Sequence, residues 1–337
     1  MAFEWESYTT DELLELRLCD LGLRIEDTWL DGLVHRVLDE LAERGISFRP
    51  HFWLADEWFS PDHVPGVGVP FYLAHPRLMR LERRLMFEVE GGTRTECLML
   101  LRHEMGHAMQ HAFQLQRRRR WQQYFGRASE PYPDYYQPNP RSKRYVVHLD
   151  GWYAQAHPAE DFAETFAVWL NPRSRWRETY AGWAARKKLQ YVDDLMDELA
   201  GARAKVASRK RPYSLPSLRH SLRAHYKRRQ DHYSPGYGDE YDRDLLRLFS
   251  AAPRHRRNES AGSFLRRHRR EIREQVAEWT GEYQFTLDQV LKEMIGRSRM
   301  LKLRLARSER ATKLSFAIML TSHTVQLLHR RNEWHPL

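Results

Sequence analysis

The stretch TRTECLMLLRHEMGHAMQHAFQL, residues 93–115, decides the fold of the region around it. Thr93 and Glu96 form a capping box, which predicts that a helix begins at about Thr93. Apolar residues lie on nearly every side of this helix, as in segments 98–101 and 105–109, so we expect the helix to be buried. Its ionisable side chains then need partners inside the protein.

Two histidines and a glutamate in this helix have the spacing of a zinc motif. His103 and His107 are four residues apart on one helix face, so both imidazoles can reach one Zn²⁺ at about 2.0–2.1 Å. Glu104 then points at the metal-bound water. Gly106 costs up to about 1 kcal/mol in a helix interior, which indicates that another part of the chain packs closely there.

A third ligand must come from elsewhere. His111 continues the same face, but it lies about 12 Å from His103 along the axis, too far to share one ion, and we expect it near the site. A second helix is predicted over residues 158–170, with Glu160 and Glu164 on one face. One carboxylate can complete a site with two His and one Glu, and the other can accept the free N–H of a ligating histidine.

These two motifs resemble a bacterial family of zinc-binding metallopeptidases, which is zincin-like and of gluzincin type. The resemblance rests on HEMGH at residues 103–107 and on YAQAHPAEDFAE at residues 153–164, and it extends over about residues 45–200. The spacing of the tyrosine and the two glutamates is also similar to that of lethal-factor-type toxin peptidases. The resemblance implies a zincin fold.

The family resemblance also implies roles for individual residues. His103, His107 and Glu160 would be the zinc ligands. Glu104 would be the general base that takes the proton of the zinc-bound water and delivers it to the leaving amine. Tyr153 would lie beside the metal and donate a hydrogen bond to the developing oxyanion. The expected catalytic residues are therefore Glu104 and Tyr153.

Four further residues are expected around the metal. Glu164 is the natural partner of a ligating histidine, and His111 is expected to pack near the site or to orient a neighbouring group. His157 and His148 flank the site in the sequence, and either is an alternative to Tyr153 for contact with the substrate or the transition state.

The sequence before the zinc motif predicts a sheet, and the sequence after it a long loop. Strands are expected at residues 46–54, 71–73, 78–81 and 85–89. In a zincin an edge strand pairs with the extended substrate, and residues 67–73 or 77–82 would supply that edge. The proline-containing stretch between Arg120 and Tyr145 is long for an inert loop, so we expect it to contact substrate.

Composition excludes several classes of protein. The chain has 337 residues and 42% hydrophobic content, and its apolar runs fall short of the roughly 18 residues that a membrane helix needs. Cys19 and Cys97 are too few for a disulfide framework or a Cys-based zinc site. Residues 1–10 carry no secretory pattern, so we expect a cytoplasmic protein without a membrane partner.

Charge divides the chain in two. Residues 1–200 contain 25 Lys and Arg against 31 Asp and Glu, a net charge of −6, whereas residues 201–337 contain 30 against 14, a net charge of +16. We expect an α+β metallopeptidase domain over 1–208, a Pro/Tyr/Arg-rich junction over 209–241 and an all-α basic region over 242–337. The helices of this region are expected at 242–250, 263–280, 286–305 and 311–330. Two apolar faces should need a partner surface: Phe264, Ile272, Val276 and Trp279, and Leu314, Ile318, Thr321 and Val325.

The sequence thus predicts a zinc-dependent metallopeptidase that binds one Zn²⁺ per chain and hydrolyses an amide bond of a peptide or protein. One alternative is a DNA-associated zinc protease that uses the basic C-terminal region. It is disfavoured because its hallmark would be a third histidine, where this chain offers Glu, and because an Arg-rich composition can simply reflect a GC-rich genome. A non-catalytic zinc-binding scaffold is the other alternative, and the intact Glu104 speaks against it.

Overall fold

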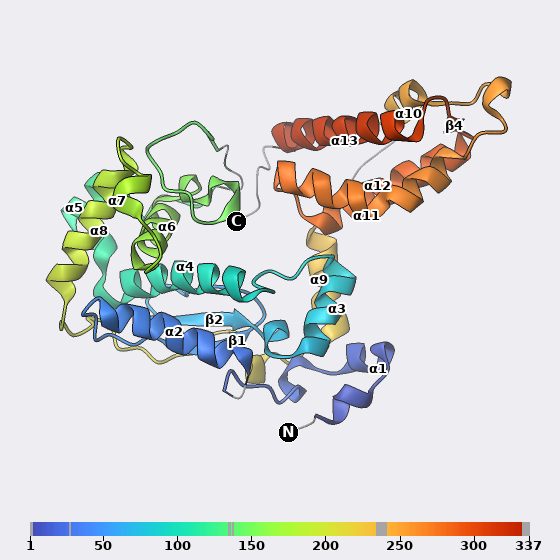
Figure 1. Ribbon diagram of the computed structural model, residues 1–337. Helices are drawn as coiled ribbons and strands as arrows, with labels where there is room; N and C mark the ends of the chain where they lie inside the picture. Colours follow the sequence, from blue (N-terminus) through green and yellow to red (C-terminus); the bar gives the residue numbers. More distant parts are fainter. Residues whose placement is uncertain (1–2, 27, 134–135, 137, 234–240, 332–337) are drawn as a thin grey trace. The chain divides into compact units, whose positions relative to one another are not determined.

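The computed structural model describes residues 3–26, 28–133, 136, 138–233 and 241–331, with side chains as far as Val325 (Figure 1). The chain divides into two compact units, the first of residues 1–83 and 89–225 and the second of residues 84–88 and 226–336. Helices dominate both, and within the described residues two small sheets accompany them. None of the described helices is long and apolar enough to cross a membrane.

The α-helices, in chain order, are α1 (Thr10–Glu15), α2 (Trp29–Glu43), α3 (Pro76–Met86), α4 (Arg94–Phe113), α5 (Arg119–Phe125), α6 (Pro158–Leu170), α7 (Trp176–Thr179), α8 (Ala185–Leu199), α9 (Leu222–His232), α10 (Asp242–Leu248), α11 (Ala261–Thr280), α12 (Gln284–Met300) and α13 (Glu309–Arg331). The strands are β1 (His51–Ala55), β2 (Gly66–Pro70), β3 (Phe249–Ser250) and β4 (Arg304–Leu305). The division between the units falls within α3 and α9.

Helix α4 lies at the centre of the first unit and packs against α6, α2 and β2. Thr93 and Glu96 form the expected capping box at its start. From Cys97 to Phe113 every residue except Met99 is buried, which confirms the prediction of a buried helix. The two His and the Glu of the zinc motif are therefore inside the protein rather than on a solvated face.

At Gly106 the backbone of α4 lies close to that of α6. A Cβ atom at this position would lie 2.8 Å from Cα of Ala163 and 3.1 Å from its carbonyl oxygen. Because these are backbone atoms, no side-chain rotation could make room for it. The missing side chain of Gly106 therefore lets the two motif-bearing helices cross at backbone contact, as the sequence indicated.

Buried ion pairs and hydrogen bonds fix α4 and α6 to their other neighbours. On the α2 side, Arg102 donates two hydrogen bonds to Glu40, from Nε to Oε2 at 2.8 Å and from Nη2 to Oε1 at 2.7 Å. On the α8 side, Lys188 pairs with the buried Asp161 of α6. Bidentate and charge-assisted bonds of this kind constrain geometry strongly. The pair of helices is thus held in one arrangement.

The sheet before α4 is smaller than expected. β1 and β2 pair in parallel, with His51 opposite Gly66 and Ala55 opposite Pro70. The strand expected at 71–73 is instead a 3₁₀ helix, Phe71–Ala74. The prediction of strands at 78–81 and 85–89 is wrong, because residues 76–86 form the helix α3. Its buried residues recur with helical spacing, at Leu78, Leu81, Glu82 and Met86.

The structure gives different outcomes for the two segments that were expected to pair with substrate. Residues 77–82 are helical, so they supply no edge strand and that expectation is wrong. In the other segment, Gly68 of β2 exchanges two backbone hydrogen bonds with Phe59 on the side away from β1. At Gly68, therefore, both edges of β2 are already paired.

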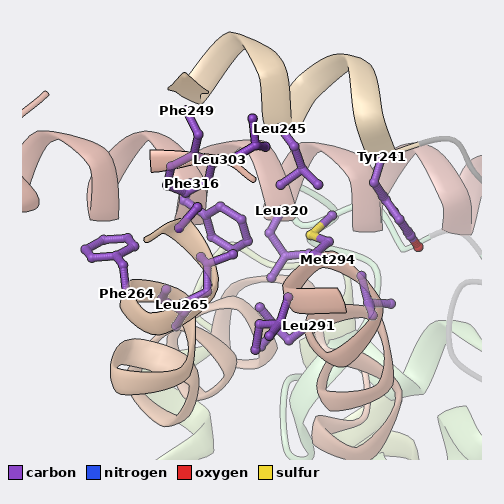
Figure 2. Packing of buried hydrophobic residues seen from close by; sticks show 14 of the residues in the cluster. Tyr241, Leu245, Phe249, Phe264, Leu265, Leu291, Met294, Leu303, Phe316 and Leu320 are labelled. Atoms are coloured by element: carbon purple, nitrogen blue, oxygen red, sulfur yellow. The ribbon is translucent and has the colours of Figure 1, made fainter. Parts of the chain in front are cut away.

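The second unit has a hydrophobic core of its own, built from α10, α11, α12 and α13 (Figure 2). Its members include Leu245, Phe264, Leu291, Phe316 and Leu320. The four helices expected here are all present, with boundaries shifted by a few residues. The region is not purely α, because Phe249 and Ser250 of β3 pair antiparallel with Leu305 and Arg304 of β4.

The expected apolar faces of this unit are partly wrong. Phe264, Ile272 and Val276 are buried, but Trp279 is 81% exposed. On α13 the residues Leu314 and Ile318 are also exposed, since the helix turns Phe316 and Leu320 toward the core instead.

The expected junction at residues 209–241 is divided between the units. Residues 209–225 belong to the first unit, where Leu215, Leu218 and Leu222 are buried and the backbone N–H groups of Leu18 and Cys19 donate to the carbonyls of His220 and Leu218. Helix α9, which was not expected, lies within this stretch, and residues 234–240 lie outside the described residues.

Candidate metal centre

Three side chains from α4 and α6 converge on one point. Nε2 of His103 lies 3.0 Å from Oε2 of Glu160, and Nε2 of His107 lies 3.2 Å from the same oxygen. The two Nε2 atoms are 3.1 Å apart. All three residues are buried, and among the described residues they form a group that could hold a metal ion. The crossing of α4 over α6 at Gly106 brings them together.

Glu164 binds Nδ1 of His103, the ring nitrogen that does not face Glu160. Nδ1 of His103 donates a hydrogen bond of 2.8 Å to Oε1 of Glu164, and the backbone N–H of Leu149 donates to Oε2 at 2.9 Å. With both carboxylate oxygens engaged, Glu164 cannot rotate freely. Because Nδ1 of His103 is engaged by Glu164, Nε2 is the nitrogen left to face the convergence point.

Glu160 has a second partner that the sequence reasoning missed. Tyr132 donates its hydroxyl to Oε1 of Glu160 at 2.8 Å, leaving Oε2 directed at the two histidines. The ring of Tyr132 stacks on that of His157, with 3.8 Å between centroids. The proline-containing stretch was singled out for substrate contact, but no local pattern distinguishes Tyr132 from the neighbouring tyrosines. Its contact with Glu160 depends on how the loop returns to α6.

Contacts within this cluster shift the pKa values of His103 and Glu160 in opposite directions. Burial alone would lower the pKa of His103, but hydrogen bonds to Glu160 and Glu164 outweigh it and raise that pKa well above its usual value. Burial alone would likewise raise the pKa of Glu160, whereas His107 and His103 bring it well below its usual value. Both pKa shifts favour an ionised Glu160 facing a protonated His103, so the cluster holds opposite charges together.

Glu104 is buried beside the cluster but is not part of it. Its Oε2 atom has no hydrogen-bond partner among the described residues, although the residue is only 7% exposed. Burial raises the pKa of Glu104, against the opposing influence of His107 and His103. An orphaned carboxylate oxygen in such a place normally has an ion or water as its missing partner.

The ring of Tyr153 lies next to that of His103. Their ring centroids are 5.6 Å apart. Tyr153 lies within a 3₁₀ helix (Asp150–Gln155) that is bent just before it, where Gly151 has φ of 72° and Trp152 of 55°. Burial raises the pKa of Tyr153 well above its usual value, with Glu160 adding to the effect, so its hydroxyl keeps its proton.

Two further tyrosines accompany Tyr153. Tyr136 donates its hydroxyl to the carbonyl of Gly151 at 3.0 Å, and its ring centroid is 6.2 Å from that of Tyr153. Tyr132, which is half exposed, reaches Glu160 as described above. The loop therefore brings neutral hydroxyl donors to the site, and Tyr136 also supports the bend that positions Tyr153.

The remaining histidines take structural positions. His157 caps α6: its Nδ1 accepts from the N–H of Ala159, and its Nε2 donates to the carbonyl of Glu130. His148 donates its Nε2 proton to the carbonyl of Met99 on α4. Both nitrogens of His157 and one of His148 are thus bonded to backbone, which speaks against the substrate contacts suggested for them.

His111 stands apart from the three converging side chains. Its nearest ionic partner among the described residues is Asp62, with 3.7 Å between Nε2 and Oδ1. Burial lowers the pKa of His111 to about 4, and the neighbouring His107 adds to this. A neutral His111 packed near the site agrees with its exclusion as a ligand, but it makes no described hydrogen bond to one.

The donor set fits a zinc ion. A tetrahedral ion with bonds of about 2.0–2.1 Å separates its ligand atoms by about 3.3 Å, close to the separations between these three atoms. Two imidazoles and one carboxylate suit zinc better than magnesium or calcium, which prefer oxygen ligands. Glu104 follows His103 in the sequence and its buried Oε2 is unpartnered among the described residues, so this carboxylate is available to such a site as a base.

Comparisons with known proteins agree with this geometry. Residues 82–204 match the family model described as "Putative zinc-binding metallo-peptidase". Searches of curated proteins and of solved structures found no match. The matched segment contains α4, α6 and all three converging side chains. The match thus covers both motifs on which the resemblance to zinc-binding metallopeptidases rests.

Proposed function

We propose that the protein is a zinc-dependent metallopeptidase that hydrolyses an amide bond, with His103, His107 and Glu160 as the ligands. The observation that carries the proposal is the meeting of His103 Nε2, His107 Nε2 and Glu160 Oε2 beside the unpartnered carboxylate of Glu104. A scaffold that merely stores zinc would need the three ligands but not a buried carboxylate held at high energetic cost next to them.

The proposed chemistry divides among residues of this chain. Zn²⁺, when bound, supplies a Lewis acid that polarises a carbonyl and lowers the pKa of water. Oε2 of Glu104 takes a proton from the attacking water and passes it to the leaving amine. The protonated hydroxyl of Tyr153 donates to the oxyanion that develops on the substrate carbonyl. Glu164 keeps the Nδ1 proton of His103 in place throughout.

We propose that the first unit has a zincin-like arrangement of gluzincin type. Support comes from the crossing of α4 by α6, since the two His come from the first helix and the Glu from the second. The small parallel sheet of β1 and β2 lies beside α4, as β2 packs against that helix.

Zinc content tests this proposal directly. We expect protein purified without added metal and then supplied with zinc to hold one zinc ion per chain by elemental analysis. His107→Ala should hold none, because two ligands do not retain the ion. Hydrolysis of a quenched-fluorescent peptide library should follow the zinc content and disappear with a chelator. A zinc content near zero in the parent protein would contradict the proposal.

Tyr132→Phe tests whether the tyrosine positions Glu160. Removing the hydroxyl leaves Oε1 of Glu160 without its donor, so we expect zinc affinity to fall about 10-fold. Competition with a fluorescent chelator measures this without any substrate. Tyr124→Phe is the matched control, because Tyr124 stacks on Tyr191 and no described contact joins it to the three ligands, and it should leave the affinity unchanged. Equal affinities in both variants would show that Tyr132 has no such role.

A further inference from the structure

The end of the second unit near β3 and β4 carries a concentrated positive charge. The chain comes back to this end twice, in segments 251–260 and 296–310, which together contain nine Lys and Arg and two Glu, a net charge of +7. Backbone hydrogen bonds hold the two segments side by side. The N–H of Leu305 donates to the backbone carbonyl of Glu259, and the N–H of Ala261 donates to the carbonyl of Leu303. The two segments therefore meet at the end of the unit where β4 lies (Figure 1), and their charge is gathered in space as well as in sequence.

The two carboxylates at this end, Glu259 and Glu309, already form ion pairs. Nη2 of Arg267 binds Glu259 at 2.7 Å, while its Nη1 binds Glu309 at 2.7 Å. His268 also contacts Glu309, at 2.9 Å. Arg267 lies on α11, outside the two segments, so the acids of this end neutralise a cation from elsewhere and leave the local cations uncompensated.

Seven side chains make up what we call the basic end. They are exposed, and no ion pair with a carboxylate is seen for them among the described residues: Arg254, Arg256, Arg257, Arg299, Lys302, Arg307 and Arg310. Arg299 is placed beside α11, because a Cβ on Gly262 would lie 2.9 Å from its Cγ. The β3–β4 pairing and the packed core beneath hold these residues on a fixed scaffold.

We propose that the basic end binds the phosphate backbone of double-stranded nucleic acid. Six of its seven cations are arginines, whose planar guanidinium binds two phosphate oxygens at once. Uncompensated cations on a rigid surface gain most from a polyanion whose bound counterions are released on contact. The inference does not rest on the peptidase activity, because it uses only residues of the second unit.

Other anionic partners fit this surface less well. Single strands bind through stacked aromatic side chains, but the exposed Trp279 is 18 residues along α11 from Ala261, about 27 Å away. A membrane-inserting or protein-binding surface would need several apolar anchors. Among the described residues, Met300 is the one exposed large apolar side chain within the two segments.

Fluorescence anisotropy of the full chain with a 30-bp DNA duplex tests the proposal. If about five phosphates are contacted, binding should weaken about 500-fold between 50 and 200 mM salt. The triple variant Arg254→Gln, Arg256→Gln, Arg257→Gln should bind on the order of 10- to 100-fold more weakly at 50 mM salt, with a shallower salt dependence. A second variant, Arg307→Gln with Arg310→Gln, should weaken binding in the same direction from the other segment.

A control of equal charge change separates local from overall charge. Arg117→Gln, Arg119→Gln and Arg173→Gln remove three exposed arginines of the first unit and should change the affinity less than three-fold. Absence of duplex binding at 50 mM salt would overturn the proposal, as would equal losses in the two triple variants. Tighter binding to phosphatidylserine vesicles or to polyglutamate than to the duplex would also overturn it, in favour of a membrane or an acidic protein.

Discussion

Glu104→Gln is expected to lower peptide hydrolysis by about 10²- to 10⁴-fold while zinc stays bound, because an amide cannot accept the proton of the attacking water. Glu104 is not one of the three converging residues, and its Oε2 has no partner in the described part of the chain. Gln has nearly the same shape, so the buried site should accept it without a change in fold. The measurement pairs kcat/KM on a peptide identified from the library with zinc content by elemental analysis.

Two comparison variants show whether the loss of hydrolysis is due to the missing base at residue 104. Glu96→Gln makes the same chemical change on the same helix, but in the exposed capping box, and should leave hydrolysis within about two-fold. His107→Ala should lose zinc and hydrolysis together. Should Glu104→Gln turn over substrate at the parent rate, the general base would have to be sought elsewhere, and neither comparison variant could rescue the assignment.

The position of the metal centre could be predicted from sequence because its determinants are local. His103 and His107 are one helical turn apart, and the capping box at Thr93 together with the apolar flanks fixes that helix. Glu160 and Glu164 stand in the same relation on α6, whose start is marked by Pro158. Helical spacing alone left the roles of the two glutamates open, whereas the structure points Glu160 at both histidines and Glu164 at Nδ1 of His103.

What surrounds the centre could not be predicted, because it depends on contacts distant in sequence. Tyr132 reaches Glu160 from 28 residues away in the sequence, through a loop with no periodic pattern. His148 and His157 were suggested for substrate contact because they lie near the motif in sequence, but both bond to backbone. Proximity along the chain is a weak guide once loops fold back on helices.

The errors in the fold have an equally physical origin. Residues 78–81 and 85–89 were assigned to strands because of short apolar runs, yet Pro76 is the first residue of a helix and the basic residues between the apolar ones face outward. On α13, Phe316 and Leu320 compete with Leu314 and Ile318 for the core, and the sequence contains both apolar faces. Only the packing of α10 and α11 decides which face is buried.

Gly106→Ala is expected to be strongly disruptive, although alanine favours helices over glycine by about 1 kcal/mol. The new methyl group would lie 2.8 Å from Cα of Ala163 and 3.1 Å from its carbonyl oxygen, so α4 and α6 must move apart. Overpacking of this kind costs about 1–3 kcal/mol, which exceeds the gain in helix propensity. Because His103 and His107 lie on one helix and Glu160 on the other, separating the helices also pulls the ligands apart.

Gly32→Ala is the matched control for this substitution. Gly32 lies within α2 of the same unit, and a Cβ there would meet no atom within 4 Å. We therefore expect Gly32→Ala to raise the midpoint of urea unfolding, and Gly106→Ala to lower both that midpoint and the zinc affinity. If Gly106→Ala were as stable as Gly32→Ala and bound zinc as tightly as the parent, the close crossing of α4 and α6 would not be what brings the ligands together.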